Sequence, residues 1–111
     1  MSRDVVLAVV EAHLSAFNAR DADLVAALFA DDATMAAGDQ LVVGRRGLHA
    51  AFADSFAAPL HPTLELRRAV VEGDTAACEL AQHLPGVTLE VAAFFTVRDG
   101  ELVRLRIYRE T

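Results

Sequence analysis

Residues 87–109 read VTLEVAAFFTVRDGELVRLRIYR, two runs of alternating side chains that meet at Asp99-Gly100. Both central residues of a tight hairpin turn need positive φ, and Asp-Gly is one of the pairs that supply it most readily. The sequence therefore predicts two antiparallel strands, Val87–Arg98 and Glu101–Arg109. Alternation assigns one face of this hairpin to the core, namely Leu89, Val91, Ala93, Phe95, Val97, Val103, Leu105 and Ile107.

Two further strands are expected before this hairpin, over residues 63–71 and Thr75–Leu84. Glu72-Gly73-Asp74 and Pro85-Gly86 supply the turn residues between them. In the second of these strands, alternation places five residues on the core side: Ala76, Cys78, Leu80, Gln82 and Leu84. Four strands joined by short turns indicate an antiparallel meander.

The first half of the chain has the period of helices instead. Asp4 is the expected cap of a first helix that ends near Asn18 and carries His13 on its apolar stripe. Asp21 is the expected cap of a second, short helix, which Asp31-Asp32 would close.

A third helix is expected after two short extended pieces, which occupy residues 34–43 around the turn Gly38-Asp39. This helix follows residues 44–47, has Ser55 on its apolar side and ends before Pro59. Helical segments followed by an antiparallel meander define the α+β class.

Length and hydropathy indicate one folded domain. The chain has 111 residues, of which 54% are hydrophobic, and a mean hydropathy of +0.32, so a single domain over residues 1–111 is expected. No apolar run approaches the roughly 20 residues that cross a bilayer. The first residues lack the pattern of a signal peptide, so we expect a cytoplasmic protein.

Several kinds of chemistry are excluded by composition. All ten cationic residues are Arg, and without Lys neither Schiff-base catalysis nor a P-loop is available. The single Cys78 excludes an intramolecular disulfide and a Cys-rich metal site. The net charge of −6 works against binding to nucleic acid or an anionic membrane. We expect no cofactor and no metal, and partners that are small molecules or another protein chain.

Four segments resemble the nuclear transport factor two-like superfamily, and within it the SnoaL-like and ketosteroid isomerase-like branch. They are FNARD at 17–21, LFADDAT at 28–34, GRRGL at 44–48 and FTVRDGELV at 95–103. The resemblance implies a cone-shaped, bent, antiparallel-rich sheet wrapped around three N-terminal helices. It also implies an apolar pocket between the helices and the sheet, and commonly a homodimer.

The same resemblance locates the positions of the branch's catalytic groups. The general-base Asp of ketosteroid isomerase corresponds to Ala37, with Asp39 two residues further on, and its neutral oxyanion-binding Asp corresponds to Ala93. Its Tyr donor corresponds to His13, and the late Asp of SnoaL-like cyclases corresponds to Ile107. The carboxylates of both family mechanisms are therefore missing.

His13 and Asp39 remain as candidate catalytic residues. His13 could serve as an acid or base near neutral pH, or it could be a core histidine bonded to a backbone carbonyl. Asp39 could reach a pocket only if the loop register shifts, and is otherwise a turn residue. The candidate ligand-binding residues are Phe17, Met35, Phe52, Phe56, Gln82, Phe95, Leu105 and Arg109.

Gln82, Arg109 and several other polar residues each have a plain structural alternative to a functional role. Gln82 could contact a ligand or make a structural bond, and Arg109 could hold a substrate oxygen or be solvated. Arg45 and Arg46 could bind an anion, or form a salt bridge with Asp31 or Asp32. His61 could fold over the pocket rim or lie on a surface loop, and His49 is expected to be exposed. His83 and Glu79 are too widely spaced for a metal pair.

Two functional hypotheses follow. The first is a small-molecule enzyme that acts on an apolar, oxygenated substrate by proton transfer, as an isomerase, cyclase, dehydratase or epoxide-opening enzyme. The second is a non-catalytic ligand-binding or dimeric accessory protein. The outer face of the sheet mixes apolar with charged side chains, including Phe94 and Tyr108, and is the expected homodimer face.

Overall fold

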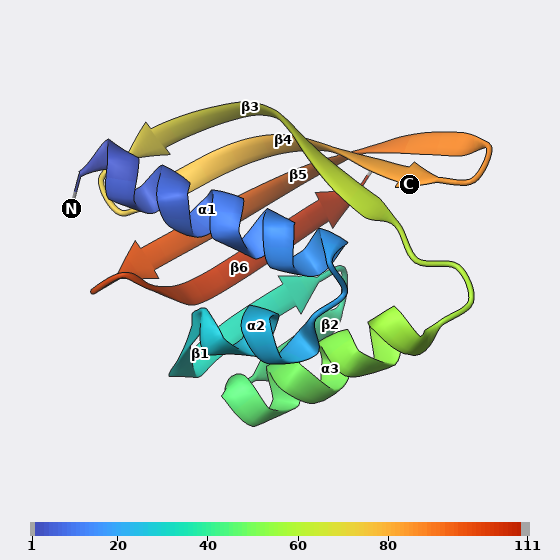
Figure 1. Ribbon diagram of the computed structural model, residues 1–111. Helices are drawn as coiled ribbons and strands as arrows, with labels where there is room; N and C mark the ends of the chain where they lie inside the picture. Colours follow the sequence, from blue (N-terminus) through green and yellow to red (C-terminus); the bar gives the residue numbers. More distant parts are fainter. Residues whose placement is uncertain (1, 110–111) are drawn as a thin grey trace.

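A six-stranded sheet bends around one long helix (Figure 1). The computed structural model describes residues 2–109. The helices are α1 (Arg3–Asn18), α2 (Ala22–Ala27) and α3 (Arg45–Ala57). The strands are β1 (Phe29–Ala37), β2 (Gln40–Val43), β3 (Thr63–Glu72), β4 (Thr75–Leu84), β5 (Val87–Arg98) and β6 (Glu101–Arg109). Their order in the sheet is β2-β1-β6-β5-β4-β3, which confirms the α+β class.

The meander β3-β4-β5-β6 forms as the sequence predicts. Three of its strands have the expected bounds, and β3 ends one residue later, at Glu72. Asp99 and Gly100 both have positive φ, 53° and 79°, as the turn between β5 and β6 requires. The expected core side of this hairpin is buried at Val91, Ala93, Phe95, Val97 and Leu105. The expectation was wrong at Leu89, which is 42% exposed, and at Val103: Leu102 is buried instead, next to the register shift between Thr96 and Val97.

The sheet is larger than the expected meander, because β1 adds to it in parallel with β6 and β2 pairs with β1. The expectation that Asp31-Asp32 would close the second helix was wrong. That helix ends at Ala27, and the amide of Leu102 donates to the carbonyl oxygen of Leu28 at 2.8 Å, so the chain enters the sheet at once. The third helix follows β2, as the sequence predicts.

Arg45 holds β1 where its pairing with β6 is irregular. The register shifts between Phe29 and Thr34, and the Asp31-Asp32 pair lies in this bulge. Arg45 donates from Nε and Nη2 to the carbonyl oxygen of Phe29, at 2.9 and 2.6 Å. Its Nη1 lies 2.8 Å from Asp31 Oδ1, which is the salt bridge expected from the sequence, and Nη2 lies 3.2 Å from Glu101 Oε2.

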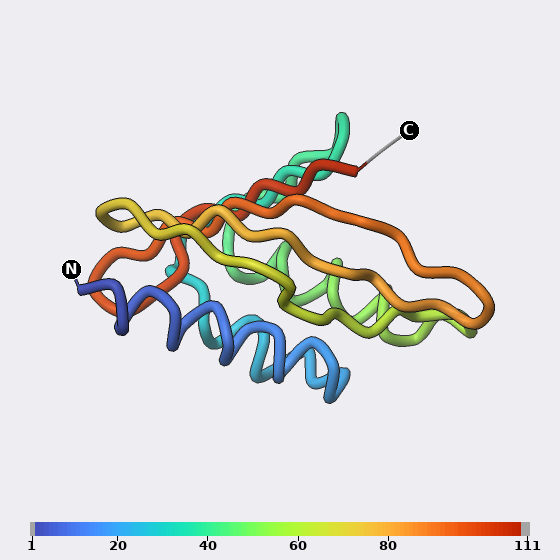
Figure 2. The backbone as a smooth tube through the Cα atoms, turned by 90° about the horizontal axis from the view of Figure 1, so that it is seen from above, coloured from blue at the N-terminus to red at the C-terminus, as the bar shows by residue number. Residues whose placement is uncertain are grey.

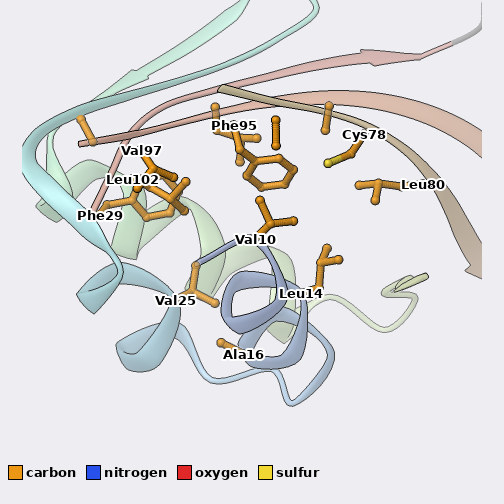
Figure 3. Packing of buried hydrophobic residues seen from close by; sticks show 14 of the residues in the cluster. Val10, Leu14, Ala16, Val25, Phe29, Cys78, Leu80, Phe95, Val97 and Leu102 are labelled. Atoms are coloured by element: carbon orange, nitrogen blue, oxygen red, sulfur yellow. The ribbon is translucent and has the colours of Figure 1, made fainter. Parts of the chain in front are cut away.

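Helix α1 lies along one face of the sheet, as Figures 1 and 2 show, and buries its apolar stripe there. Val10 and Leu14 point toward Phe95, Cys78 and Leu80 of the strands (Figure 3). Among residues 2–109, no helix has the length and apolar character needed to span a membrane.

Two details at the helix ends differ from the expectations. Ser2 caps α1 by accepting from the amide of Val5, and the expected cap, Asp4, lies in the first turn. Ser55, expected on the apolar side of α3, is exposed. Asp21 caps α2 as expected, with Oδ1 accepting from the amide of Leu24 at 3.0 Å.

We predict that Arg45→Met lowers the free energy of unfolding by about 1–3 kcal/mol, because it removes charged donors from the carbonyl of Phe29. The ion pair with Asp31 contributes little of this, since the Asp31 side chain is 91% exposed. The control is Arg46→Met at the exposed neighbouring position, which is expected to change stability by less than about 0.5 kcal/mol. Urea titration measures both, and equal effects of the two substitutions would contradict the role given to Arg45.

Candidate active site

A small cavity lies between α1 and the inward face of β3–β6. Its volume is about 70 Å³. The residues that line it are His13, Phe17, Leu64, Leu80, Gln82, Val91, Ala93, Phe95, Leu105, Ile107 and Arg109. Most of these side chains are apolar, and three bring polar atoms to the site: His13, Gln82 and Arg109.

His13 is the buried polar residue of this site. It is 3% exposed, because the stripe that buries Val6 and Val10 of α1 continues through it. Four phenylalanine rings surround the imidazole at centroid distances of 5.5–6.4 Å: Phe17, Phe29, Phe52 and Phe95. Its Nδ1 atom is buried and has no hydrogen-bond partner among residues 2–109. The alternative of a core histidine bonded to a carbonyl is therefore not observed at Nδ1.

Burial among these rings lowers the pKa of His13 from its ordinary 6.5 to about 4. The imidazole is therefore uncharged at neutral pH, and it can form hydrogen bonds without bringing a charge into the cavity. A buried polar atom without a partner costs about 1–3 kcal/mol.

The structure brings together six of the ten predicted site residues. Around the cavity lie His13, Phe17, Gln82, Phe95, Leu105 and Arg109. Phe52 and Phe56 pack on Phe17, with ring centroids 6.2 and 5.3 Å away, and lie behind the lining. Met35 is the register partner of Leu105 and does not line the cavity. Asp39 lies in the exposed turn between β1 and β2, away from the cavity, so the register shift that it needed is not observed.

Five lining residues were not among the predicted site residues: Leu64, Leu80, Val91, Ala93 and Ile107. Four of them had been placed on the core side by strand alternation. That signal identifies a buried face but does not distinguish the walls of a cavity from the packed core around it.

The three family carboxylate positions lie side by side on the inward face. Ala93 of β5 pairs in register with Ile107 of β6, and Ile107 pairs with Ala37 of β1. Ala93 and Ile107 line the cavity directly. The positions at which the family mechanisms place carboxylates are therefore apolar here, and no Asp or Glu of residues 2–109 lines the cavity.

The other histidines lie away from the cavity. His49 Nε2 lies 2.7 Å from Asp23 Oδ1, and His83 bridges Glu65 at 2.8 Å and Thr88 at 3.1 Å. The hydrogen bond from His83 is the main cause of the lowered pKa of Glu65. His61 is half-buried, with its Nδ1 unpartnered within the described chain.

Metal binding and thiol chemistry find no support here. Within residues 2–109, no three His, Cys, Asp or Glu side chains gather as a metal site. Burial raises the pKa of the Cys78 thiol to about 11, so the reactive thiolate is scarce at neutral pH.

We predict that His13→Leu stabilises the protein by about 1–3 kcal/mol at pH 7, because an apolar side chain of similar size replaces an unpartnered buried polar group. His49→Leu is the control, since its ring is 44% exposed, and we expect a change of less than about 0.5 kcal/mol. Chemical denaturation measures both. A loss of stability in His13→Leu would mean that the imidazole is satisfied by a contact not described above.

The stabilisation by His13→Leu is expected to grow as the pH falls. The unfolded chain takes up a proton at His13 near pH 6.5 and the folded protein only near pH 4, so the wild type loses stability between these values. The total is about 3 kcal/mol. The His13→Leu variant has no titrating group at this position. The difference in free energy of unfolding between the variant and the wild type should therefore grow by about 3 kcal/mol between about pH 7 and pH 4. An advantage that stays constant over this range contradicts the low pKa.

Comparison with known proteins supports the same fold. A protein from Kribbella flavida, assigned provisionally as a ketosteroid isomerase, has a TM-score of 0.86 at 21% identity, covering 97% of this chain and 79% of its own. An LEH-like epoxide hydrolase from M. tuberculosis has a TM-score of 0.82 at 22% identity, with coverage of 96% and 84%.

A third structure comes from Catenulispora acidiphila, a hypothetical protein with a ketosteroid isomerase-like fold in complex with trimethylamine. Its TM-score is 0.81 at 20% identity, with coverage of 92% of this chain and 85% of its own. At these identities the three structures share the fold with this chain, and their activities are their own.

Sequence comparison gives the family. A search of the curated proteins found no match. A family model described as SnoaL-like domain matches residues 10–105, from the middle of α1 to β6. Because this match covers most of the sequence, the chain belongs to the SnoaL-like domain family and has the nuclear transport factor two-like, ketosteroid isomerase-like fold.

Proposed function

We propose that the protein binds a compact, mostly apolar small molecule in the cavity beside His13. The observation that carries the proposal is a cavity lined by the 3% exposed imidazole of His13, whose Nδ1 has no hydrogen-bond partner within residues 2–109. A core selected for stability alone has no reason to keep such a group beside an unfilled space.

The volume of the cavity limits the size of the guest. The cavity has a volume of about 70 Å³. Pockets for drug-sized ligands are several times larger, about 300–1,000 Å³. A small ring or a branched chain fits this space, whereas a polycyclic molecule does not. Trimethylamine, bound by one structural relative, is a molecule of the size that fits.

Binding without catalysis is the better supported of the two functional hypotheses. The row Ala37, Ile107 and Ala93 offers no carboxylate. The low pKa of His13, about 4, means that the ring carries no proton to donate as an imidazolium at neutral pH.

Proton transfer by His13 remains the second candidate. One observation favours it: the ring is uncharged and its Nδ1 is unpartnered, so it is available as a base. Its low pKa makes it a weak base, and a weak base accelerates proton transfer little.

The binding proposal predicts that cyclopentanone enters the cavity with a dissociation constant on the order of 1 mM. NMR titration should shift the resonances of Ala93 and Ile107. Ala93→Leu fills the cavity and should abolish these shifts, whereas the control Ala50→Leu, at an exposed position of α3, should keep them. Absence of any shift in the wild type, under conditions where the fold is intact, contradicts the proposal.

A mixture of the protein and cyclopentanone in deuterium oxide distinguishes binding alone from proton transfer by His13. With binding alone, the protons next to the ketone exchange at the rate seen without protein. An accelerated exchange that disappears in His13→Leu would favour proton transfer by His13 instead.

We further propose that two copies associate through the outer face of the sheet. This face exposes Val70, Phe94 and Tyr108 by 41–52%, and the rings of Phe94 and Tyr108 stack edge to face at 5.8 Å. Positive Arg104 lies on β6 and negative Glu79 on β4. A two-fold axis between them would place the arginine of one copy over the glutamate of the other.

Light scattering tests this association. Twice the chain mass of 11.9 kDa is expected for the wild type at micromolar concentration. Phe94→Glu should give the single mass, because it buries a charge at the centre of the interface. Leu24→Glu, on the exposed side of α2, should leave the double mass unchanged. A single mass for the wild type excludes the dimer.

A further inference from the structure

A second hollow adjoins the cavity at the ends of β1 and β6. Its volume is about 300 Å³, and Ile107 and Arg109 line both spaces. It forms because β1 leaves the sheet at Gly38, whose φ is 61°, while β6 continues past Ile107 to Arg109. The small side chains of Ala36 and Ala37 leave this notch open.

The charged side chains that line this notch within residues 2–109 are positive, in a protein that is acidic as a whole. Arg106 and Arg109 line the hollow, and within residues 2–109 no Asp or Glu lines the hollow or the cavity. On its other side, Arg109 borders a hollow that contains Glu79 and Glu90. The chain as a whole carries 16 acidic residues and a net charge of −6. Local positive charge beside an apolar cavity attracts an anionic group to that point.

The cavity favours an apolar group and the notch favours an anionic group, so the two spaces suit the two ends of one molecule. Beside His13, the aromatic rings and the uncharged imidazole offer no counter-charge, so an ion placed at this end of the cavity would lose its hydration without compensation. At the notch Arg109 is exposed, so an anion can stay hydrated while it meets the guanidinium. A planar carboxylate matches the paired N–H donors of one arginine.

We infer that the ligand is a small apolar carboxylic acid whose hydrocarbon part fills the cavity and whose carboxylate lies against Arg109, with Arg106 nearby. This inference rests on the proposed function, because it names the class of molecule that the cavity takes. It assigns Arg109 the role of selecting an anion over a neutral or cationic molecule of the same shape.

Three molecules of one shape test the inference: cyclopentanecarboxylate, cyclopentanecarboxamide and cyclopentylmethylammonium. Binding to the full chain is measured by NMR titration at low salt. We expect the carboxylate to bind about fivefold tighter than the amide, and the ammonium to bind weakest. Arg109→Gln should bring carboxylate and amide to equal affinity. Arg3→Gln, which changes the net charge equally at the start of α1, should keep the difference. Added salt should reduce it.

The outcomes separate this inference from the proposed function. If the amide binds and the carboxylate gains nothing, the ligand class is wrong while binding in the cavity stands. If the ammonium binds best, or if Arg109→Gln leaves the preference for carboxylate unchanged, the role of Arg109 is overturned. If none of the three molecules binds while cyclopentanone does, the ligand class is wrong; if cyclopentanone does not bind either, the proposed function fails as well.

Discussion

Arg45 connects the irregular part of the sheet to the site. It binds the carbonyl of Phe29 where the register of β1 and β6 shifts, and the Phe29 ring packs on His13 at 5.8 Å. The same guanidinium reaches Glu101 at the start of β6, the strand that carries Leu105 and Ile107 to the cavity. The walls around His13 therefore depend on a bulge that the backbone ladder alone does not satisfy.

Much of the fold could be predicted from the sequence because its turns contain residue pairs that are typical of hairpins. Asp99-Gly100 and Pro85-Gly86 mark hairpins, and strand bounds follow from them. The parallel pairing of β1 with β6 was missed for a physical reason. Asp31-Asp32 breaks the alternation of β1, and the bulge is held by hydrogen bonds from Arg45, in another element, to the carbonyl of Phe29. The sequence indicated a salt bridge between Arg45 and the acidic pair, but not the bond to this carbonyl.

The part of the site that could be predicted is the direction in which each side chain points. Periodicity placed His13, Gln82 and Arg109 on the inward faces of their elements, and all three line the cavity. The volume of the cavity was not predictable, because it depends on how the rings of Phe17, Phe52 and Phe95 pack around the imidazole. Family positions identified Ala37, Ala93 and Ile107 as missing carboxylates, but their adjacency in one row required the register.

An uncharged imidazole without a partner at Nδ1 is the feature on which the functional account depends. The direct measurement is the NMR titration of the His13 ring in the folded, ligand-free protein. The account predicts that the ring stays neutral through pH 6 and titrates with a pKa of about 4. A midpoint near the ordinary 6.5 would show a solvated or charge-paired ring, and it would contradict the burial of His13 among apolar rings.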